Sequence, residues 1–166
     1  MTQENDTQNN NPATMFVGMK LISANPVPAP DDVKGDNKPG DLGYDVYYEN
    51  GYTAWSPKAV FEEAYQAIRN GMSFGSAIFM LKRGRKVARK GWNGKDMFIY
   101  LSDGLNLDSK SLTGAAAKQL LPVLPGVPNS FKICPHIDMK AADGTIVVGW
   151  LASQTDMLAD DWIVID

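Results

Sequence analysis

The N-terminal part of the chain alternates between apolar or aromatic runs and turn-forming residues. The run MFVGMKLI at residues 15–22 is typical of a strand, and the Pro-, Gly- and Asp-rich stretch 23–43 favours irregular structure. Two aromatic runs, 44–48 and 52–55, flank Glu49-Asn50-Gly51. Because Asn-Gly suits the tight turn of a β-hairpin, these two runs are predicted to pair as antiparallel strands.

Residues 56–70 have the pattern of an amphipathic helix. Ser56 is placed to cap this helix, Pro57 suits its first position and Gly71 suits its end. Its apolar face is predicted to consist of Val60, Phe61, Ala64, Tyr65 and Ile68. Residues 15–70, the N-terminal unit, are therefore expected to form a separate small ββα unit with its own core.

A second helical pattern begins after Met72. Ser73 suits its cap and Gly84 its end, and its apolar positions are Phe74, Ala77, Ile78 and Leu81. KVARK at 86–90 and DMFIYL at 96–101 are then predicted to be strands. They are joined by a loop that contains Gly91-Trp92-Asn93-Gly94.

The rest of the chain predicts a long connection, a hairpin and a closing strand. The connection spans 102–130 and includes a short helical pattern at 111–121. FKICPHIDMK at 131–140 and TIVVGWL at 145–151 are predicted to pair around the turn Asp143-Gly144.

Ser153 and Asp156 form a variant capping box for a short helix, and DWIVID at 161–166 is expected to be the last strand. Residues 72–166, the C-terminal unit, therefore predict an α+β fold. Its small antiparallel sheet carries a packed N-terminal helix and a short C-terminal helix.

The composition is that of an ordinary globular protein, with 44% hydrophobic residues and a formal net charge of −3. Any attraction for anions must therefore come from local clusters. The single cysteine, Cys134, excludes an intrachain disulfide. Residues 1–14 are polar, lack the features of a secretory signal and are expected to form a disordered tail. No apolar run approaches the length of a membrane span, so no membrane partner is expected.

Charge is distributed unevenly in the C-terminal unit. No acidic residue lies between Met72 and Lys95, whereas residues 82–95, the basic strip, include seven cations. From His136 onward aspartates dominate. The cations and the aspartates can attract each other or be solvated separately, and either arrangement accounts for most of these charges.

The loop around Trp92 has the parts that a nucleotide-like ligand needs. An indole offers a stacking surface, Asn93 an amide, and Arg89 a cation for phosphate, while Gly91 and Gly94 permit a close backbone approach. A purely structural role fits the same residues: Trp92 can anchor the hydrophobic core, and Asn93-Gly94 can be a plain turn. The loop sequence alone does not choose between binding and structure.

Two further clusters offer chemistry. On a continuous strand Cys134, His136, Asp138 and Lys140 share one face. Neighbours two apart on a strand lie about 6.6 Å from each other, so a direct Cys–His pair is disfavoured. A zinc site lacks enough Cys and His ligands. Gln154 and Thr155 begin the short helix, where free backbone N–H groups favour an anion. No catalytic residue, metal or cofactor is predicted.

Two long blocks, MSFGSAIFMLKRGRKVARKGWNGKDMFIYL and PHIDMKAADGTIVVGWLASQTDMLADDWIVI, closely resemble a family of small phage proteins, the Thoeris anti-defence proteins of the second type. The resemblance covers residues 72–166. It implies a protein without enzymatic activity that sequesters a cyclic nucleotide immune messenger of the glycocyclic ADP-ribose type. Cyclic dinucleotides are a further class of ligand for some relatives. The resemblance also implies a homotetramer with pockets between subunits, acting in the cytoplasm of the infected bacterial host.

The resemblance also assigns site residues by position. It makes Trp92 the stacking residue with Arg89 and Asn93 beside it, and it places Gln154, Thr155 and Asp156 on the opposite wall. Phe98, Trp150 and His136 are further candidates. Residues 102–130 depart from the family, which leaves the identity of the messenger open.

The N-terminal unit resembles a recurrent phage module of unknown function, through GYDVYYENGYTAWSPKAVFEEAY. Two rival functions stay open for the whole chain. One is an anti-CRISPR inhibitor that acts on a Cas nuclease complex through the basic strip, and the other is a hydrolase that degrades the messenger. Nucleic acid is not expected as a partner, because the chain is acidic overall.

Overall fold

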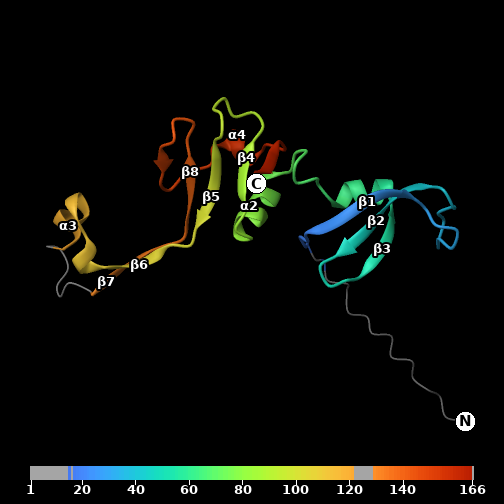
Figure 1. Ribbon diagram of the computed structural model, residues 1–166, viewed down its shortest axis with the longest axis horizontal. Helices are drawn as coiled ribbons and strands as arrows, with labels where there is room; N and C mark the ends of the chain where they lie inside the picture. Colours follow the sequence, from blue (N-terminus) through green and yellow to red (C-terminus); the bar gives the residue numbers. More distant parts are fainter. Residues whose placement is uncertain (1–14, 16, 122–128, 166) are drawn as a thin grey trace, which may run out of the picture.

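The computed structural model describes residue 15, residues 17–121 and residues 129–165, and its sheets lie in a row along the long axis (Figure 1). A three-stranded sheet lies at one end, a five-stranded sheet in the middle and a two-stranded sheet at the other end. The strand pairs are antiparallel, so the predicted α+β class is confirmed. The predicted disordered tail at 1–14 and the stretch 122–128 lie outside the described residues.

The N-terminal unit is built around the predicted hairpin. Its strands are β1 (Ile22–Pro28), β2 (Leu42–Tyr48) and β3 (Thr53–Pro57), in the order β1-β2-β3. The β2–β3 turn is confirmed. Gly51 has a φ of +83°, which glycine adopts readily, and its N–H donates to the Tyr48 carbonyl at 2.9 Å.

The first strand is displaced from its predicted position. The strand expected at 15–22 is wrong, because β1 starts at Ile22 and runs into the stretch predicted to be irregular. Pro26 and Pro28 are tolerated there because β1 is an edge strand, where a residue without an N–H costs no bond to a second neighbour.

The first helix, α1 (Lys58–Ala64), is shorter than predicted. Ser56 does not cap it: Ser56 pairs with Tyr44 in the sheet, and the N-cap is Pro57, without a side-chain hydrogen bond. The predicted apolar face is only partly correct, since Phe61 stacks on Tyr44 at 4.2 Å whereas Val60 is 58% exposed.

The five-stranded sheet has the order β10-β4-β5-β8-β9. Its strands are β4 (Lys86–Arg89), β5 (Phe98–Ser102), β8 (His136–Lys140), β9 (Ile146–Val147) and β10 (Trp162–Ile165). Helix α2 (Phe74–Lys82) packs on one face of this sheet, and its predicted cap is confirmed, because the Ser73 hydroxyl accepts from the Ser76 N–H at 3.3 Å.

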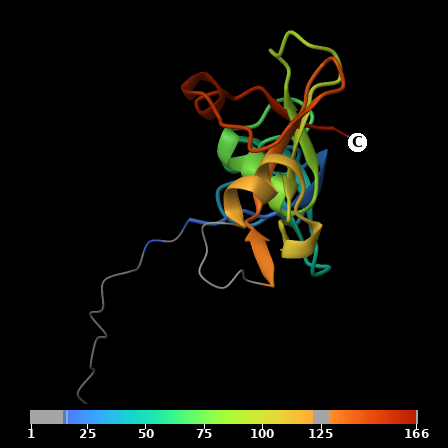
Figure 2. The same cartoon turned by 90° about the vertical axis from the view of Figure 1, so that its left-hand side faces the viewer.

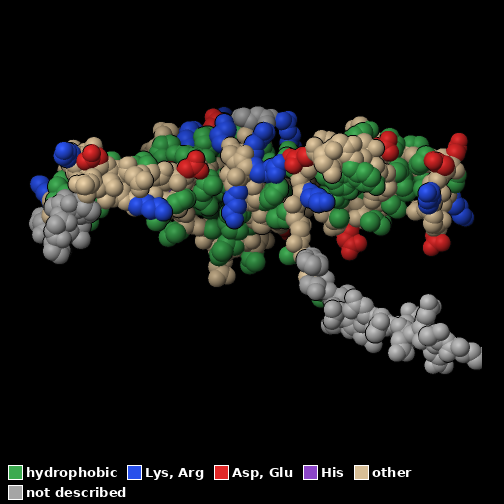
Figure 3. Space-filling view, turned by 90° about the horizontal axis from the view of Figure 1, so that it is seen from below, with side chains coloured by type: hydrophobic (Ala, Val, Ile, Leu, Met, Phe, Trp, Pro, Cys, Tyr) green, Lys and Arg blue, Asp and Glu red, His purple; other side chains and the backbone are tan. Residues whose placement is uncertain are grey.

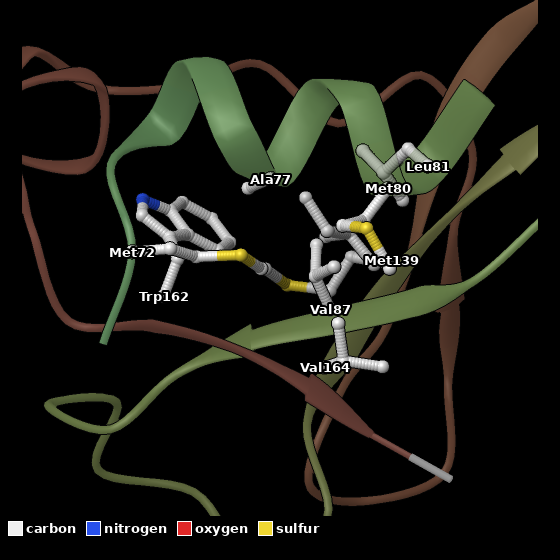
Figure 4. Packing of buried hydrophobic residues seen from close by; sticks show 9 residues of the cluster. Met72, Ala77, Met80, Leu81, Val87, Met139, Trp162 and Val164 are labelled. Carbon is white, nitrogen blue, oxygen red and sulfur yellow. The ribbon is translucent and has the colours of Figure 1, made fainter. Parts of the chain in front are cut away.

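The hydrophobic core lies between α2 and this sheet (Figure 4). Ala77 and Leu81 of α2 meet Val87 and Ile99 of the central strands, and Trp162 of β10 closes one end with 0% exposure.

The predicted long connection contains a projecting arm, which Figure 2 shows from its outer end. The arm consists of β6 (Leu105–Asp108), the 3₁₀ turn Ser109–Ser111, α3 (Gly114–Leu120) and β7 (Ser130–Ile133). The predicted helix is confirmed as α3. The β6–β7 pair was not predicted, because each strand has only four residues.

The arm also corrects the second predicted hairpin. The expected single strand 131–140 is interrupted at Cys134-Pro135, and its halves belong to different sheets. Cys134 therefore does not share a strand with His136, which overturns that predicted alignment. The partner strand is reduced to Ile146–Val147.

The N-terminal unit is joined to the C-terminal unit by hydrogen bonds and by an ion pair. The Val164 N–H donates to the Ile68 carbonyl at 2.8 Å. Met72, the first residue of the C-terminal unit, exchanges two backbone hydrogen bonds with Trp162, at 2.8 and 3.1 Å. Arg83 forms an ion pair with Glu49. Residues 68–72 thus cover the outer side of β10.

Candidate functional site

The loop between β4 and β5, residues 90–97, carries Trp92 and is fixed at its start by Asp161. The Lys90 N–H donates to the Asp161 carbonyl at 3.1 Å, and the Gly91 N–H donates to its carboxylate at 2.9 Å. A Cβ atom at Gly91 would lie 3.0 Å from that carboxylate oxygen. Glycine therefore permits the close approach that starts the loop.

The Trp92 indole lies half-buried against two other indoles. Its ring centroid is 6.1 Å from that of Trp150 at an interplanar angle of 70°, and 5.4 Å from that of Trp162 at 77°. Edge-to-face pairs of this kind are favourable. The ring is thus anchored to the hydrophobic core while part of its surface stays exposed to solvent.

Opposite the loop lies α4 (Gln154–Met157), and its predicted capping box is confirmed. The Ser153 hydroxyl accepts from the Asp156 N–H at 3.1 Å, and the Asp156 carboxylate accepts from the Ser153 N–H at 3.1 Å. The Trp162 Nε1–H donates to the Asp156 carbonyl at 2.9 Å, which holds this short helix to the core.

One guanidinium connects the loop, α4 and the start of β10. Arg89 Nε donates to Asp161 Oδ1 at 2.7 Å, and Nη1 donates to Asp156 Oδ1 at 3.0 Å and to the Thr155 carbonyl at 3.1 Å. Asp156 Oδ1 also accepts from the Trp92 Nε1–H at 3.3 Å. The Arg89 side chain is 19% exposed, so these charge-assisted bonds are partly shielded from solvent.

The pKa values follow from this network. Hydrogen bonds to Asp161 and then to Asp156 raise the pKa of Arg89 above its usual range. The bond from Arg89, with that from the Gly91 N–H, lowers the pKa of Asp161. Burial alone would raise the pKa of Asp156, but hydrogen bonds from Ser153, Arg89 and Trp92 outweigh burial and lower it. All three groups are therefore charged at neutral pH.

This pairing changes the role predicted for Arg89. One guanidinium faces two carboxylates, so the group has no surplus positive charge to offer a phosphate. Lys90 Nζ donates to the Asn70 carbonyl at 2.8 Å, whereas Lys95 in the same loop is exposed. Lys95 is therefore better placed to meet an anion than Arg89.

Most of the predicted site residues come together here. The structure brings Trp92, Arg89, Trp150, Thr155 and Asp156 into one connected group. Asn93 lies beside Trp92 in the loop and Gln154 begins α4, and both are exposed.

Two predicted residues lie on the other face of the sheet. Ile99 faces α2, so its strand neighbour Phe98 points to the opposite face, where it pairs with Lys140. His136 pairs with Ser102 on that same open face. Within one chain, neither side chain reaches Trp92.

Asp161 belongs to the site but was not predicted as a site residue. It precedes Trp162, which pairs with Arg89 across the β10–β4 ladder. Only this register brings Asp161 to the guanidinium. The clustering of aspartates after residue 155 was the one available signal.

The basic strip lies over the middle of the molecule, where Lys and Arg side chains gather (Figure 3). Its charges are partly engaged: Arg83 pairs with Glu49, Arg89 with two aspartates, and the Lys86 ammonium lies 5.2 Å from the Phe98 ring centroid. These cations of the basic strip are therefore engaged in contacts within the chain, so the strip is not simply a charged surface for a partner.

Two surface hollows lie away from this group. One, of about 220 Å³, lies on the N-terminal unit beside Pro26, Leu42 and Tyr44, and the other, of about 300 Å³, lies at the base of the arm beside Leu105 and Ile133. Neither hollow is lined by a predicted site residue. Across the described ranges, 15, 17–121 and 129–165, the helices are too short or too polar to cross a bilayer.

Comparison with known proteins places the C-terminal unit, a small α+β domain, in the phage anti-defence class. The model of the Thoeris anti-defense 2-like domain matches residues 72–165. A curated protein of Bacillus phage SP01, Thoeris anti-defense 2, is 38% identical over 98 residues, which cover 59% of this chain and 99% of the relative. The chain therefore belongs to the Thoeris anti-defense 2-like family, which confirms the resemblance noted in the sequence.

Proposed function

We propose that the C-terminal unit, residues 72–166, binds and sequesters a cyclic nucleotide messenger of the glycocyclic ADP-ribose type without degrading it. The observation that carries this proposal is the Trp92 loop held against α4 by Asp156, within a chain of the anti-defence family. Sequestration is governed by mass action, so the protein must bind the messenger more tightly than the host effector does. It acts in the cytoplasm of the infected bacterial host.

The chemistry of the group assigns two kinds of residue. Each Asp156 oxygen already accepts two hydrogen bonds: Oδ1 from Arg89 and Trp92, and Oδ2 from the backbone and hydroxyl of Ser153. Asp156 and Arg89 therefore shape the site. The ring surface of Trp92 and the exposed amides of Asn93 and Gln154 remain for the base and ribose of the ligand.

The proposal is tested with the full chain by isothermal titration calorimetry. Glycocyclic ADP-ribose is expected to bind saturably at 150 mM salt, about the physiological ionic strength. Cyclic dinucleotides are titrated in parallel to define selectivity. After heat denaturation, chromatography is expected to recover the ligand intact.

The possible results separate the rival functions. Loss of the ligand during incubation would show a hydrolase, and the absence of any binding would refute sequestration. A single-stranded oligonucleotide that binds at low salt and is released at moderate salt would favour nucleic-acid recognition through the basic strip.

We also propose that a second copy of the chain completes the pocket in a homotetramer. Large apolar side chains next to α4 are uncovered: Leu151 is 88% exposed, Leu158 80% and Val148 70%. Large apolar side chains that are exposed in this way favour a protein partner over solvent.

Leu151→Asp is expected to dissociate the oligomer and to weaken capture of glycocyclic ADP-ribose, because it places a charge in the proposed interface. Light scattering coupled to size exclusion measures the mass of wild type and variant. Val60→Asp, at an exposed apolar position on α1, serves as the control and is expected to change neither property. A monomeric wild type that still captures the ligand would refute the shared pocket.

A further inference from the structure

Asp138 of β8 stands apart from the other charged residues in the described part of the chain. It is 5% exposed and is the only charged side chain there that is buried. It lies on the open face of the five-stranded sheet and pairs across the ladder with Tyr100. Because a buried carboxylate is costly unless it is hydrogen-bonded, the partners of Asp138 indicate what it does.

Three groups surround the Asp138 carboxylate. Oδ1 accepts from the Gly149 N–H at 3.0 Å and lies 3.3 Å from His136 Nε2, while the Tyr100 hydroxyl is its third neighbour. Loss of hydration and the charge of Asp138 raise the pKa of Tyr100. His136 is turned toward this carboxylate, and its Nδ1 lies 2.8 Å from the Cys134 carbonyl.

The hydrogen bond from the Gly149 N–H to Asp138 fixes the point, just after the edge strand β9, at which the chain passes from the open face of the sheet to the α2 face. Gly149 has a φ of +74°, which glycine adopts at little cost, and the next amide, Trp150 N–H, donates to the Ile137 carbonyl at 2.7 Å. Two successive amides are therefore held by β8. The Trp150 indole then lies on the α2 side of the sheet, against Trp92 and Trp162.

Only three residues separate Gly149 from the cap of α4. Leu151 is 88% exposed, so within one chain the hydrogen bonds of Gly149 and Trp150 anchor the segment that leads into α4. The helix itself is tied to the core by hydrogen bonds that Arg89, Trp92 and Trp162 donate to Thr155 and Asp156.

From this geometry we infer that Asp138 is a positioning residue for the ligand site, acting from the opposite face of the sheet. By holding Gly149 it sets where Trp150 and the first turn of α4 stand relative to Trp92. The effect on ligand capture rests on the proposed function, whereas the effect on the position of Trp150 does not.

Asp138→Ala tests this inference in the full chain. Loss of the acceptor is expected to accelerate hydrogen exchange of the Gly149 and Trp150 amides by at least about tenfold, as expected when a hydrogen bond to a charged group is lost. The near-UV circular dichroism of the packed indoles is expected to weaken. The dissociation constant for glycocyclic ADP-ribose is expected to rise about tenfold.

Asp143→Ala is the matched control, because Asp143 also accepts a backbone amide, that of Thr145 at 2.9 Å, but does not contact Gly149. It is expected to leave the exchange at Gly149 and the affinity unchanged. Asp138→Asn retains an oxygen acceptor but loses the charge, so it is expected to recover part of the protection and affinity that Asp138→Ala loses.

The outcomes separate the two proposals. Unchanged exchange and dichroism in Asp138→Ala, or equal losses in Asp143→Ala, would overturn the positioning role whatever the ligand does. If the wild type binds no messenger, but exchange of the Gly149 and Trp150 amides accelerates in Asp138→Ala as predicted, only the proposed function is overturned. If Asp138→Ala does not fold, an unprotected Gly149 amide in the wild type or in Asp138→Asn would overturn the inference.

Discussion

Trp92→Ala is expected to weaken capture of glycocyclic ADP-ribose by about a hundredfold, close to the upper range measured for one base stacked on an aromatic side chain. The truncation also removes the edge-to-face contacts with Trp150 and Trp162, so we expect a loss of about 3 kcal/mol in the free energy of unfolding. Calorimetry measures the affinity, and urea unfolding measures the stability.

A second tryptophan separates these two effects. Trp55 in β3 is half-buried and donates from Nε1 to the Val27 carbonyl at 3.4 Å, far from α4 in the sequence and in the fold. Trp55→Ala is expected to lower stability without changing the affinity. Equal capture by wild type and Trp92→Ala would show that Trp92 serves only the core.

Arg89→Met is expected to lower the free energy of unfolding by about 2–3 kcal/mol at neutral pH, because it leaves two partly buried carboxylates without their cation. It is also expected to weaken capture, since Asp156 then loses one of the groups that hold it against Trp92. Arg83→Met, which breaks the exposed pair with Glu49, is the control and is expected to cost less than about 1 kcal/mol.

The Arg89 effect depends on pH in a defined direction. Asp156 and Asp161 have lowered pKa values in the folded chain, so their stabilising contribution is complete above the ordinary carboxyl pKa of about 3.9. It is lost as the pH falls through the lower folded values. The difference in stability between wild type and Arg89→Met should therefore be largest near pH 7 and shrink below about pH 4. A difference that is constant across this range would contradict the ion-pair network.

Local signals in the sequence were sufficient for several elements. Asn50-Gly51 predicted the first hairpin, and Ser73 and Ser153 predicted the starts of α2 and α4. Each of these signals acts within a few residues, so no knowledge of distant partners was needed.

The errors arose where a distant partner decides the local structure. Pro26 and Pro28 were interpreted as breaking regular structure, but an edge strand tolerates them once β2 lies on one side only. Ser56 was predicted as a helix cap, but it pairs with Tyr44 in the sheet instead. Neither outcome follows from the nearby sequence.

The candidate site shows the same limit. The sequence placed Trp92 and Asp156 on facing walls through the family resemblance, and the structure joins them by a hydrogen bond. It did not identify Asp161, and it did not separate Phe98 from Trp92. Both depend on strand register, because a shift of one residue moves a side chain to the other face.

Residues 68–72 have a consequence for how the protein behaves when it is abundant. An exposed sheet edge invites end-to-end polymerisation, and this hazard grows with the concentration of the protein. Pairing of Ile68 and Met72 with β10 closes one such edge, and the prolines of β1 blunt another. Because Ile68 belongs to the N-terminal unit, that unit contributes to closing the β10 edge.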